Sequence, residues 1–282
     1  TQAYHIPTII SLEGLLDVAL LEQSLKTIVA RHEVLRTNII PQDGIGYQKV
    51  IPSSGWFLEK EIIEEELLVD NLGDFLGKPF DLSQDYMLRS KLYDVGNDKY
   101  VLACVFHHIS SDAWSENILI SEFMELYSSL QSGREARLPE LSLQYPDYAI
   151  WQRKYLEGEV LENQLSYWKE KLTGVNTLEL PTDYTRPSVQ SIEGANTFLI
   201  FDEELTTSIK ELCKEEGVTL FMLLLSAFKV LLSRYSGQND ICVGTPIANR
   251  TQSELEGMIG FFVNTLALRS DLSNNPSFKE LL

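Results

Sequence analysis

The sequence VLACVFHHISSDAW, from Val101 to Trp114, changes from an apolar run to a polar loop within a few residues. Both faces of VLACVF are apolar, which is typical of a strand buried in the middle of a sheet. Because side chains alternate along a strand, His107 and His108 point to opposite faces. We therefore expect one histidine to support the structure and the other to reach a cleft at the end of the strand.

The residues around the histidine pair have other interpretations. Asp112 precedes a helix predicted at 115–130, so it either caps that helix or pairs with a cation that fixes the loop. Ser110 and Ser111 lie in the loop, where a serine more often makes local hydrogen bonds than acts as a nucleophile. Cys104 is expected to be inert in its apolar strand. A metal would need more ligands than Asp112 adds to the two histidines.

Composition narrows the possible functions. The 282 residues are 44% hydrophobic and 23% charged, which is ordinary for a globular protein with room for two cores. A net charge of -18 opposes binding to nucleic acid or to an anionic membrane. Cys104, Cys213 and Cys242 are widely spaced among apolar neighbours, which suits reduced thiols in the cytoplasm. The apolar run 218–232 is too short to span a bilayer and contains Lys229, so we expect a buried helix.

Strand and helix patterns mix along the chain and predict an α/β (α+β) fold in two lobes. Strands are expected at 6–12, 35–40, 46–51, 88–95, 99–107, 197–201, 240–247 and 260–272, and helices at 17–31, 59–77, 115–130, 160–172, 203–216, 219–235 and 252–258, with a loop over 143–151. A stretch rich in Pro, Thr, Asp and Gly predicts a linker at 176–195, between a first lobe at 1–175 and a second at 196–282. The final SFKELL resembles the first turn of a helix, so we expect a piece of a longer protein.

FHHISSDAWS resembles the HHxxxDG signature of the condensation domains of nonribosomal peptide synthetases, a branch of the chloramphenicol acetyltransferase-like acyltransferases. Four further stretches are similar to motifs of the same family, in the same order. They are RHEVLRTNI at 31–39, YPDYAIW at 145–151, VGTPIANR at 243–250 and IGFFVNTLALR at 259–269. Five motifs across almost the whole chain make the resemblance specific, whereas HHxxxD alone would be weak.

The sequence also departs from the family pattern. The opening SxAQxRLW motif is absent, and so are the two motifs that follow IGFFVNT. The resemblance therefore implies the interior of a condensation domain, with most of the first lobe and a truncated second lobe. Ala113 stands where the family usually has glycine, whose missing side chain permits close backbone approach. The methyl group of Ala113 either narrows the site or is tolerated.

The resemblance implies an amide-bond-forming acyltransferase with His108 as its catalytic residue. The acceptor amine attacks a donor thioester, and both substrates are carried on phosphopantetheine arms, so the domain binds no cofactor of its own. Whether His108 is a base or an orienting group stays open. His107 and Asp112 would support the site, with Asp112 paired to Arg36, or to Arg31 as second choice.

The implied architecture is a V of two acetyltransferase-like lobes with a tunnel between them. Ala113, Trp114 and Asn264 would line the cleft, although plain packing is an equally good interpretation of Trp114. In the YPDYAIW stretch, Tyr145, Asp147 and Trp151 would support the structure. The expected partners are an upstream donor and a downstream acceptor peptidyl carrier protein, with an adenylation domain adjacent in the same synthetase.

Three alternatives remain. An epimerisation domain shares HHxxxD and deprotonates an α-carbon, but RHEVLRT and IGFFVNT favour condensation. An acyltransferase of the same fold could use soluble acyl-CoA, yet that needs basic residues for the phosphates, which this acidic chain does not suggest. From another class, an inactive carrier-docking module would only recruit partners. Loss of the histidines would favour that module, and both histidines are present.

Overall fold

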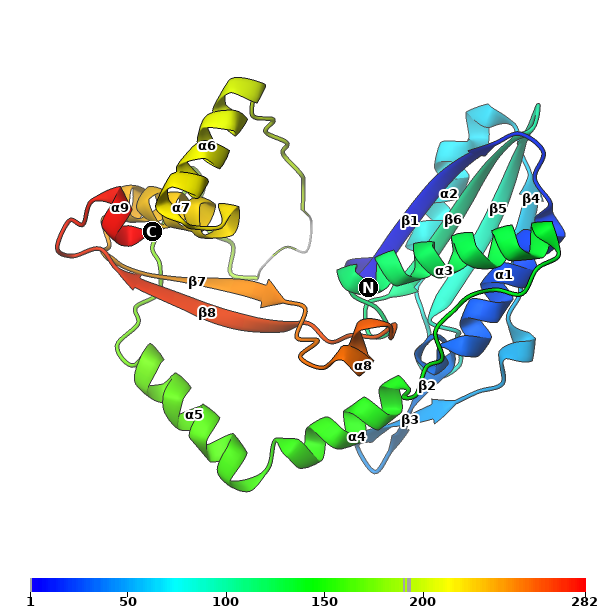
Figure 1. The fold of residues 1–282 in the computed structure, drawn as a ribbon, viewed down its shortest axis with the longest axis horizontal. Coiled ribbons are helices and arrows are strands. Elements are labelled where there is room, and N and C mark those ends of the chain that lie inside the picture. Colours follow the sequence, from blue (N-terminus) through cyan, green and yellow to red (C-terminus); the bar gives the residue numbers. More distant parts are fainter. Residues whose placement is uncertain (1, 190, 192–193) are drawn as a thin grey trace. The chain divides into compact units, whose positions relative to one another are not determined.

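The computed structural model describes residues 2–189, 191 and 194–282, and its contacts form two compact units (Figure 1). The first unit is Thr1–Leu156 with Ala248–Val263, and the second is Glu157–Ile247 with Asn264–Leu282. These units divide the chain differently from the expected lobes, because 248–263 returns to the first unit. Residues 190, 192 and 193 of the expected linker lie outside the described residues. The lobe and linker limits stay predictions.

A four-stranded sheet organises the first unit. It has the order β1-β6-β5-β4, from β1 (His5–Glu13), β6 (Lys99–His107), β5 (Leu88–Gly96) and β4 (Glu59–Ile62). β6 is antiparallel to both of its neighbours, and β4 runs parallel to β5. The expected central strand is thus confirmed. Residues 59–62, expected to open a helix, instead form the edge strand β4, and the helix that follows is shorter.

Helices cover both faces of this sheet (Figure 1). They are α1 (Val18–Arg31) and α3 (Ala113–Ser132) on one face and α2 (Leu68–Gly77) on the other. The side chains of β6 alternate between the two faces, with Leu102, Cys104 and Phe106 on the α1 and α3 side and Val101, Ala103 and Val105 on the α2 side. Asp17 caps α1 by accepting from two backbone N–H groups. This alternation decides where the side chains at the end of β6 lie.

The rest of the first unit consists of shorter elements. A hairpin joins β2 (Thr37–Gln42) to β3 (Ile45–Val50), and short 3₁₀ helices lie at Gln2–Tyr4, Glu33–Arg36, Ser53–Gly55 and Glu65–Leu67. The strand expected from residue 35 therefore begins two residues later. The segment expected as a loop begins α4 (Tyr145–Tyr155), because Pro146 occupies the first turn and Gln144 and Asp147 form a capping box. α8 (Ser253–Glu256) completes this unit.

The second unit contains α5 (Gly158–Leu172), α6 (Glu203–Glu216), α7 (Leu220–Ser236), α9 (Phe278–Leu281) and the antiparallel ribbon of β7 (Asp240–Ile247) and β8 (Asn264–Asp271). The prediction of a strand at 197–201 is wrong. These residues pair with no described strand, and the side chain of Ile200 is 90% exposed. The expected burial of α7 holds for one row only, Leu223, Ser226, Lys229 and Leu232, while its other faces are largely exposed.

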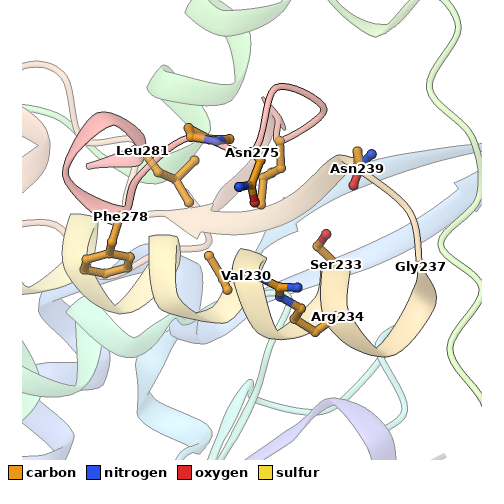
Figure 2. A pocket seen from close by; sticks show the side chains of 10 residues that line it. Val230, Ser233, Arg234, Gly237, Asn239, Asn275, Phe278 and Leu281 are labelled. Atoms are coloured by element: carbon orange, nitrogen blue, oxygen red, sulfur yellow. The ribbon is translucent and has the colours of Figure 1, made fainter.

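A cavity of about 430 Å³ lies in the second unit between α7, α9 and the chain after β8. Figure 2 shows Val230 and Arg234 of α7 on one side of it and Asn275 and Leu281 on the other. Among the described residues, no single helix combines the length and hydropathy of a membrane span. Only α6 and α7 taken together reach them, and that pair is bent by 105°.

Candidate active site

His108 lies at the exit of β6, and two hydrogen bonds fix it. Its backbone N–H donates to the Tyr4 carbonyl at 2.8 Å, and its ring Nδ1 lies 2.7 Å from the Ser111 carbonyl oxygen. A carbonyl oxygen only accepts, so Nδ1 carries the hydrogen, and in the neutral ring Nε2 is the acceptor. The described residues offer Nε2 no hydrogen-bond partner. The loop therefore presents one free basic nitrogen in a defined tautomer.

Phe261 packs against the same imidazole. The two ring centroids are 5.2 Å apart, and the ring planes are nearly perpendicular at 86°. The chain at Gly260 runs so close to its neighbours that an added Cβ would lie 2.7 Å from Cε2 of Phe262 and closer still to the Tyr145 ring. A side chain at this position would therefore have to displace the rings of Tyr145 and Phe262.

Asp112 links the histidine loop to α3 and to the segment Ala248–Val263. It is 1% exposed, and its Oδ1 accepts from the backbone N–H of Ser115 at 2.9 Å and from the Ser115 hydroxyl at 2.7 Å. Oδ1 also accepts from Arg250 at 3.1 Å, and Oδ2 accepts from the Phe262 N–H at 3.1 Å. Asp112 is therefore both the helix cap and the ion-pair partner that the sequence left as alternatives.

Arg250 is the cation of this pair. Its side chain is 1% exposed, and it also donates to the Leu255 and Met258 carbonyls. Its guanidinium carbon lies 4.1 Å from the Phe262 ring centroid and 5.8 Å from that of Trp114. Burial lowers the pKa of Arg250 and the Asp112 carboxylate opposes that shift, but an arginine stays charged at neutral pH. The pair is buried and densely hydrogen-bonded.

Arg36, the expected partner of Asp112, does not contact it. Its guanidinium donates to the Ile51 carbonyl at 2.9 Å and to the Ala30 carbonyl at 3.3 Å, with Glu33 at 3.5 Å. The physical reason is local: residues 33–36 form a 3₁₀ turn, which directs Arg36 toward its own hairpin. Arg31, the second choice, instead pairs with the buried Glu122 of α3 at 2.9 Å.

His107 lies on the other face of the sheet, as the alternation predicted. Its ring is 5.5 Å from that of Phe80 and 6.4 Å from that of His5, and its Nδ1 accepts from the Ile109 N–H at 3.1 Å. Desolvation lowers the pKa of His107, and the nearby His5 and His108 lower it further. This packed environment supports the structural role expected of His107.

The expected cleft residues differ in their surroundings. Ala113 is the first residue of α3, so its backbone is helical, and its side chain is exposed. A methyl group is therefore tolerated at that position without strain. Trp114 is partly exposed, and its indole N–H donates to the Glu256 carbonyl at 2.9 Å. Asn264 begins β8 of the second unit and caps the Thr265 N–H at 2.8 Å, so its place in a cleft stays a prediction.

The residues of the YPDYAIW motif stabilise α4 and the segment beside it. The Tyr145 hydroxyl donates to the Phe261 carbonyl at 2.7 Å, and burial raises the pKa of Tyr145 to about 12. Asp147 belongs to the capping box, and Trp151 stacks on Tyr155 with ring centroids 5.0 Å apart. The supporting roles expected of these three residues stay predictions, which the contacts favour.

Neither Ser110 nor Cys104 is activated as a nucleophile near His108. The Ser110 hydroxyl donates to the His107 carbonyl at 2.9 Å, which occupies it locally. Burial raises the pKa of Cys104 to about 11, so its thiol is protonated at neutral pH. Within the described ranges, His, Cys, Asp and Glu form no group of three or more that could hold a metal. The geometry supports proton transfer or hydrogen bonding by Nε2.

The family profile described as "Condensation domain" matches residues 1–282. This chain belongs to the condensation domain family of nonribosomal peptide synthetases. One of the proteins that make up the linear gramicidin synthase of Brevibacillus parabrevis is 46% identical over 99% of the chain, which corresponds to 6% of that relative. Malpinin synthetase of Mortierella alpina is 41% identical over 100% of the chain and 4% of its own length. The chain thus spans a small part of the curated synthetases that it matches.

Two solved structures describe the fold of this condensation-family chain. The X-domain in its complex with OxyB from teicoplanin biosynthesis has a TM-score of 0.87 at 30% identity, covering 99% of this chain and 62% of that one. The epimerization domain from the third module of tyrocidine synthetase B has a TM-score of 0.86 at 20% identity, covering 100% and 67%. The shared fold is mixed α/β, and this chain spans about two thirds of either domain.

The sequence did not single out three residues of this condensation-family site. They are Ser115, Arg250 and Phe261, all in contact with the histidine loop or with Asp112. Arg250 had a usable signal, since it is the one charged side chain in the motif VGTPIANR. Ser115 and Phe261 lie in the motifs FHHISSDAWS and IGFFVNTLALR, but nothing in those motifs distinguishes them from their neighbours.

Proposed function

We propose that this chain belongs to a domain that forms an amide bond between a donor aminoacyl or peptidyl thioester and the amine of an acceptor aminoacyl thioester. Phosphopantetheinyl carrier proteins hold both substrates. One observation carries the proposal: the hydrogen bond from His108 Nδ1 to the Ser111 carbonyl leaves Nε2 as a free acceptor. Such an atom can bind and deprotonate an attacking amine.

The chemistry needs few groups because the thioester is already activated. The acceptor nitrogen forms a bond to the donor carbonyl carbon, the carbon–sulfur bond breaks, and the proton lost by nitrogen balances the departing thiolate. Bringing two tethered substrates together supplies much of the rate. An acceptor imidazole suits this reaction, with the Ser110 hydroxyl bonded to a carbonyl and the Cys104 thiol protonated. Nε2 can orient the amine and take its proton in the same contact.

The buried Asp112–Arg250 pair supports the proposal by fixing the loop that carries His108. Both side chains are 1% exposed, and the pair joins the loop to residues 248–263. Substrate positioning errors of an ångström are costly in rate, so a loop fixed by several hydrogen bonds is an advantage. Asp112 itself lies buried away from solvent, in a supporting position.

The same proposal includes two acetyltransferase-like lobes in a V, with donor and acceptor carrier proteins docking on either side of a tunnel. The likeness to solved relatives of this family supports it. The match to a small part of a linear gramicidin synthase protein supports neighbouring carrier and adenylation domains. The free thiols of Cys104, Cys213 and Cys242 support a reducing compartment such as the cytoplasm.

A docking module is the second candidate function. Its support is the likeness, at 30% identity, to an X-domain whose solved structure is a complex with OxyB. A module of that kind would bind a partner without forming an amide. An epimerisation domain has the same fold at 20% identity and would use the same acceptor nitrogen on an α-carbon proton.

Intact-protein mass spectrometry of loaded carriers tests the proposal. The complete domain is mixed with a loaded donor carrier and a loaded acceptor carrier, as wild type and as His108→Ala. We expect the donor group to appear on the acceptor carrier, and the rate to fall by roughly 10²–10⁴-fold in the variant. His32→Gln is the control, since His32 is a buried histidine whose Nε2 is already occupied by Glu122 at 2.9 Å.

The other outcomes separate the alternatives. Deuterium incorporated from heavy water into the loaded donor, without transfer to the acceptor, would identify an epimerase. Transfer from soluble acyl-CoA would identify the related acyltransferase. Binding of a partner domain with no covalent product from any cognate carrier pair would contradict the proposal and favour the docking module.

A further inference from the structure

Phe261 contacts the imidazole of His108 but contributes little to the core. Its ring stands perpendicular to that of His108, an arrangement favoured by the charge distribution of aromatic rings. The side chain is 39% exposed, whereas the neighbouring Phe262 is 2% exposed and Ile259 is 1% exposed. The two neighbours therefore provide the packing of this segment, and Phe261 is directed at the histidine instead.

The backbone of Phe261 is fixed on both sides. The residue before it donates its N–H to the Ser115 hydroxyl, and the residue after it donates to Asp112 Oδ2, each at 3.1 Å. The carbonyl of Phe261 itself accepts from the Tyr145 hydroxyl at 2.7 Å. The ring therefore projects from a short segment that is anchored to the same helix and the same aspartate as the histidine loop.

These contacts complement the hydrogen bond that sets the tautomer of His108. The Nδ1 bond to the Ser111 carbonyl fixes one edge of the imidazole, but a single bond at one edge leaves the ring plane free to tilt. A perpendicular aromatic ring at 5.2 Å limits that tilt. Nε2, the atom that would meet an amine, then points in one direction.

We propose that Phe261 is a positioning residue, which orients the imidazole of His108 so that Nε2 meets the acceptor amine. The inference rests on the proposed function, because it assigns a role within that same site. It predicts that the Phe261 ring matters for the catalytic step more than for stability or for carrier binding.

Three variants of the complete domain test this with loaded carriers. Phe261→Leu removes the ring, Phe261→Tyr keeps it, and Phe57→Leu is a control at a phenylalanine that is 63% exposed. We expect Phe261→Leu to lower kcat by roughly 5- to 10-fold with KM for the carriers changed less than about 2-fold. Phe261→Tyr and Phe57→Leu should both stay within about 2-fold of wild type.

A second readout does not depend on turnover. Long-range ¹H–¹⁵N spectra of the imidazoles, with His108 assigned through His108→Gln, should show one Nδ1–H tautomer in wild type and in Phe261→Tyr. Phe261→Leu should show averaged or shifted His108 signals while the unfolding midpoint is unchanged. Wild-type spectra that fail to show the Nδ1–H tautomer would overturn the assignment directly.

The outcomes distinguish this inference from the proposed function. Unchanged kcat and unchanged His108 signals in Phe261→Leu would overturn the positioning role. Equal losses in the Leu and Tyr variants, together with a lower unfolding midpoint, would also overturn it and leave a structural role only. If wild type forms no amide, the proposed function fails, and the imidazole spectra still decide whether Phe261 orients His108.

Discussion

Asp112 accepts four hydrogen bonds, from Ser115, Arg250 and Phe262, while almost completely buried. A buried carboxylate needs such partners, because removing a charge from water costs several kcal/mol when nothing replaces the hydration. These contacts favour the supporting role expected of Asp112, which stays a prediction. Asp112 ties together the end of β6, the start of α3 and the segment 248–263.

Removing Arg250 alone should lower the stability of the protein more than removing the charges of both Arg250 and Asp112. We expect Arg250→Met to lower the free energy of unfolding by roughly 3–5 kcal/mol, and Asp112→Asn to recover part of that loss in the double variant. Denaturant unfolding of wild type, the two single variants and the double variant measures the coupling energy between Asp112 and Arg250. A parallel cycle with Arg36→Met should give a coupling below about 0.5 kcal/mol. A larger coupling to Arg36 than to Arg250 would contradict the Asp112–Arg250 ion pair.

His107 gives a prediction about pH. Its pKa is lowered in the folded state, from an ordinary value of 6.5, so the fold prefers the neutral ring that accepts from Ile109. As the pH falls below 6.5, the unfolded chain binds a proton first, and the protein loses stability. We expect the unfolding midpoint to fall between pH 7 and pH 5, and the fall to be smaller in His107→Phe. An identical slope in the variant would show that other groups cause it.

At the scale of elements, the space between neighbouring segments decides which glycines can be replaced by a larger residue. Gly260 lies between the Tyr145 ring and the Phe262 ring, whereas a Cβ on the nearby Gly257 would meet only Leu141, at 4.0 Å. The two glycines belong to the same segment, yet only one is required by its surroundings. They form a matched pair for substitution.

Gly260→Ala should destabilise the protein by roughly 1–3 kcal/mol, because the added methyl group must displace two aromatic rings. Gly257→Ala should change stability by less than about 0.5 kcal/mol. Thermal unfolding of both variants, with circular dichroism at two wavelengths, makes the comparison. Equal effects at the two positions would show that the segment moves freely enough to accommodate a side chain.

Alternation and apolar runs were sufficient to predict most elements, including the central strand and the helix after the histidines. These patterns failed where an element depends on pairing with another part of the chain. The run at 197–201 has strand composition, but a strand needs a neighbour to pair with, and the described chain provides none. The loop expected over 143–151 missed the start of α4, where Pro146 occupies the first turn, a position to which proline is well suited.

At the scale of the whole molecule, the first unit is assembled from two distant parts of the chain, Thr1–Leu156 and Ala248–Val263. The sequence pointed to both histidines and to Asp112 because their spacing is local. It could not pair Asp112 with Arg250, because no periodic pattern reaches across 138 residues. The sequence offered Arg36 and Arg31 as partners, and the structure shows that neither of them contacts Asp112.

Fragments test this discontinuous unit. We expect residues 1–156 to bind a synthetic peptide of residues 248–263, and the binding to change the fluorescence of Trp114, which donates to Glu256. The same peptide with Arg250→Met should bind more weakly by roughly 30-fold or more, because Asp112 is left buried and unpaired. Equal affinity of the two peptides would show that the ion pair adds nothing to the assembly.

The separation of Asp112 from Arg250 also has a consequence for synthesis on the ribosome. The two residues are 138 positions apart, so at roughly 5–20 residues per second the aspartate emerges roughly 7–28 s before its arginine. During that interval the carboxylate can remain hydrated, and the loop with His108 lacks its final anchor. The nascent sheet can form early, but the histidine loop matures only when translation has passed residue 263. Slow codons between residues 112 and 263 would prolong the state in which the sheet is folded but the histidine loop is not yet anchored.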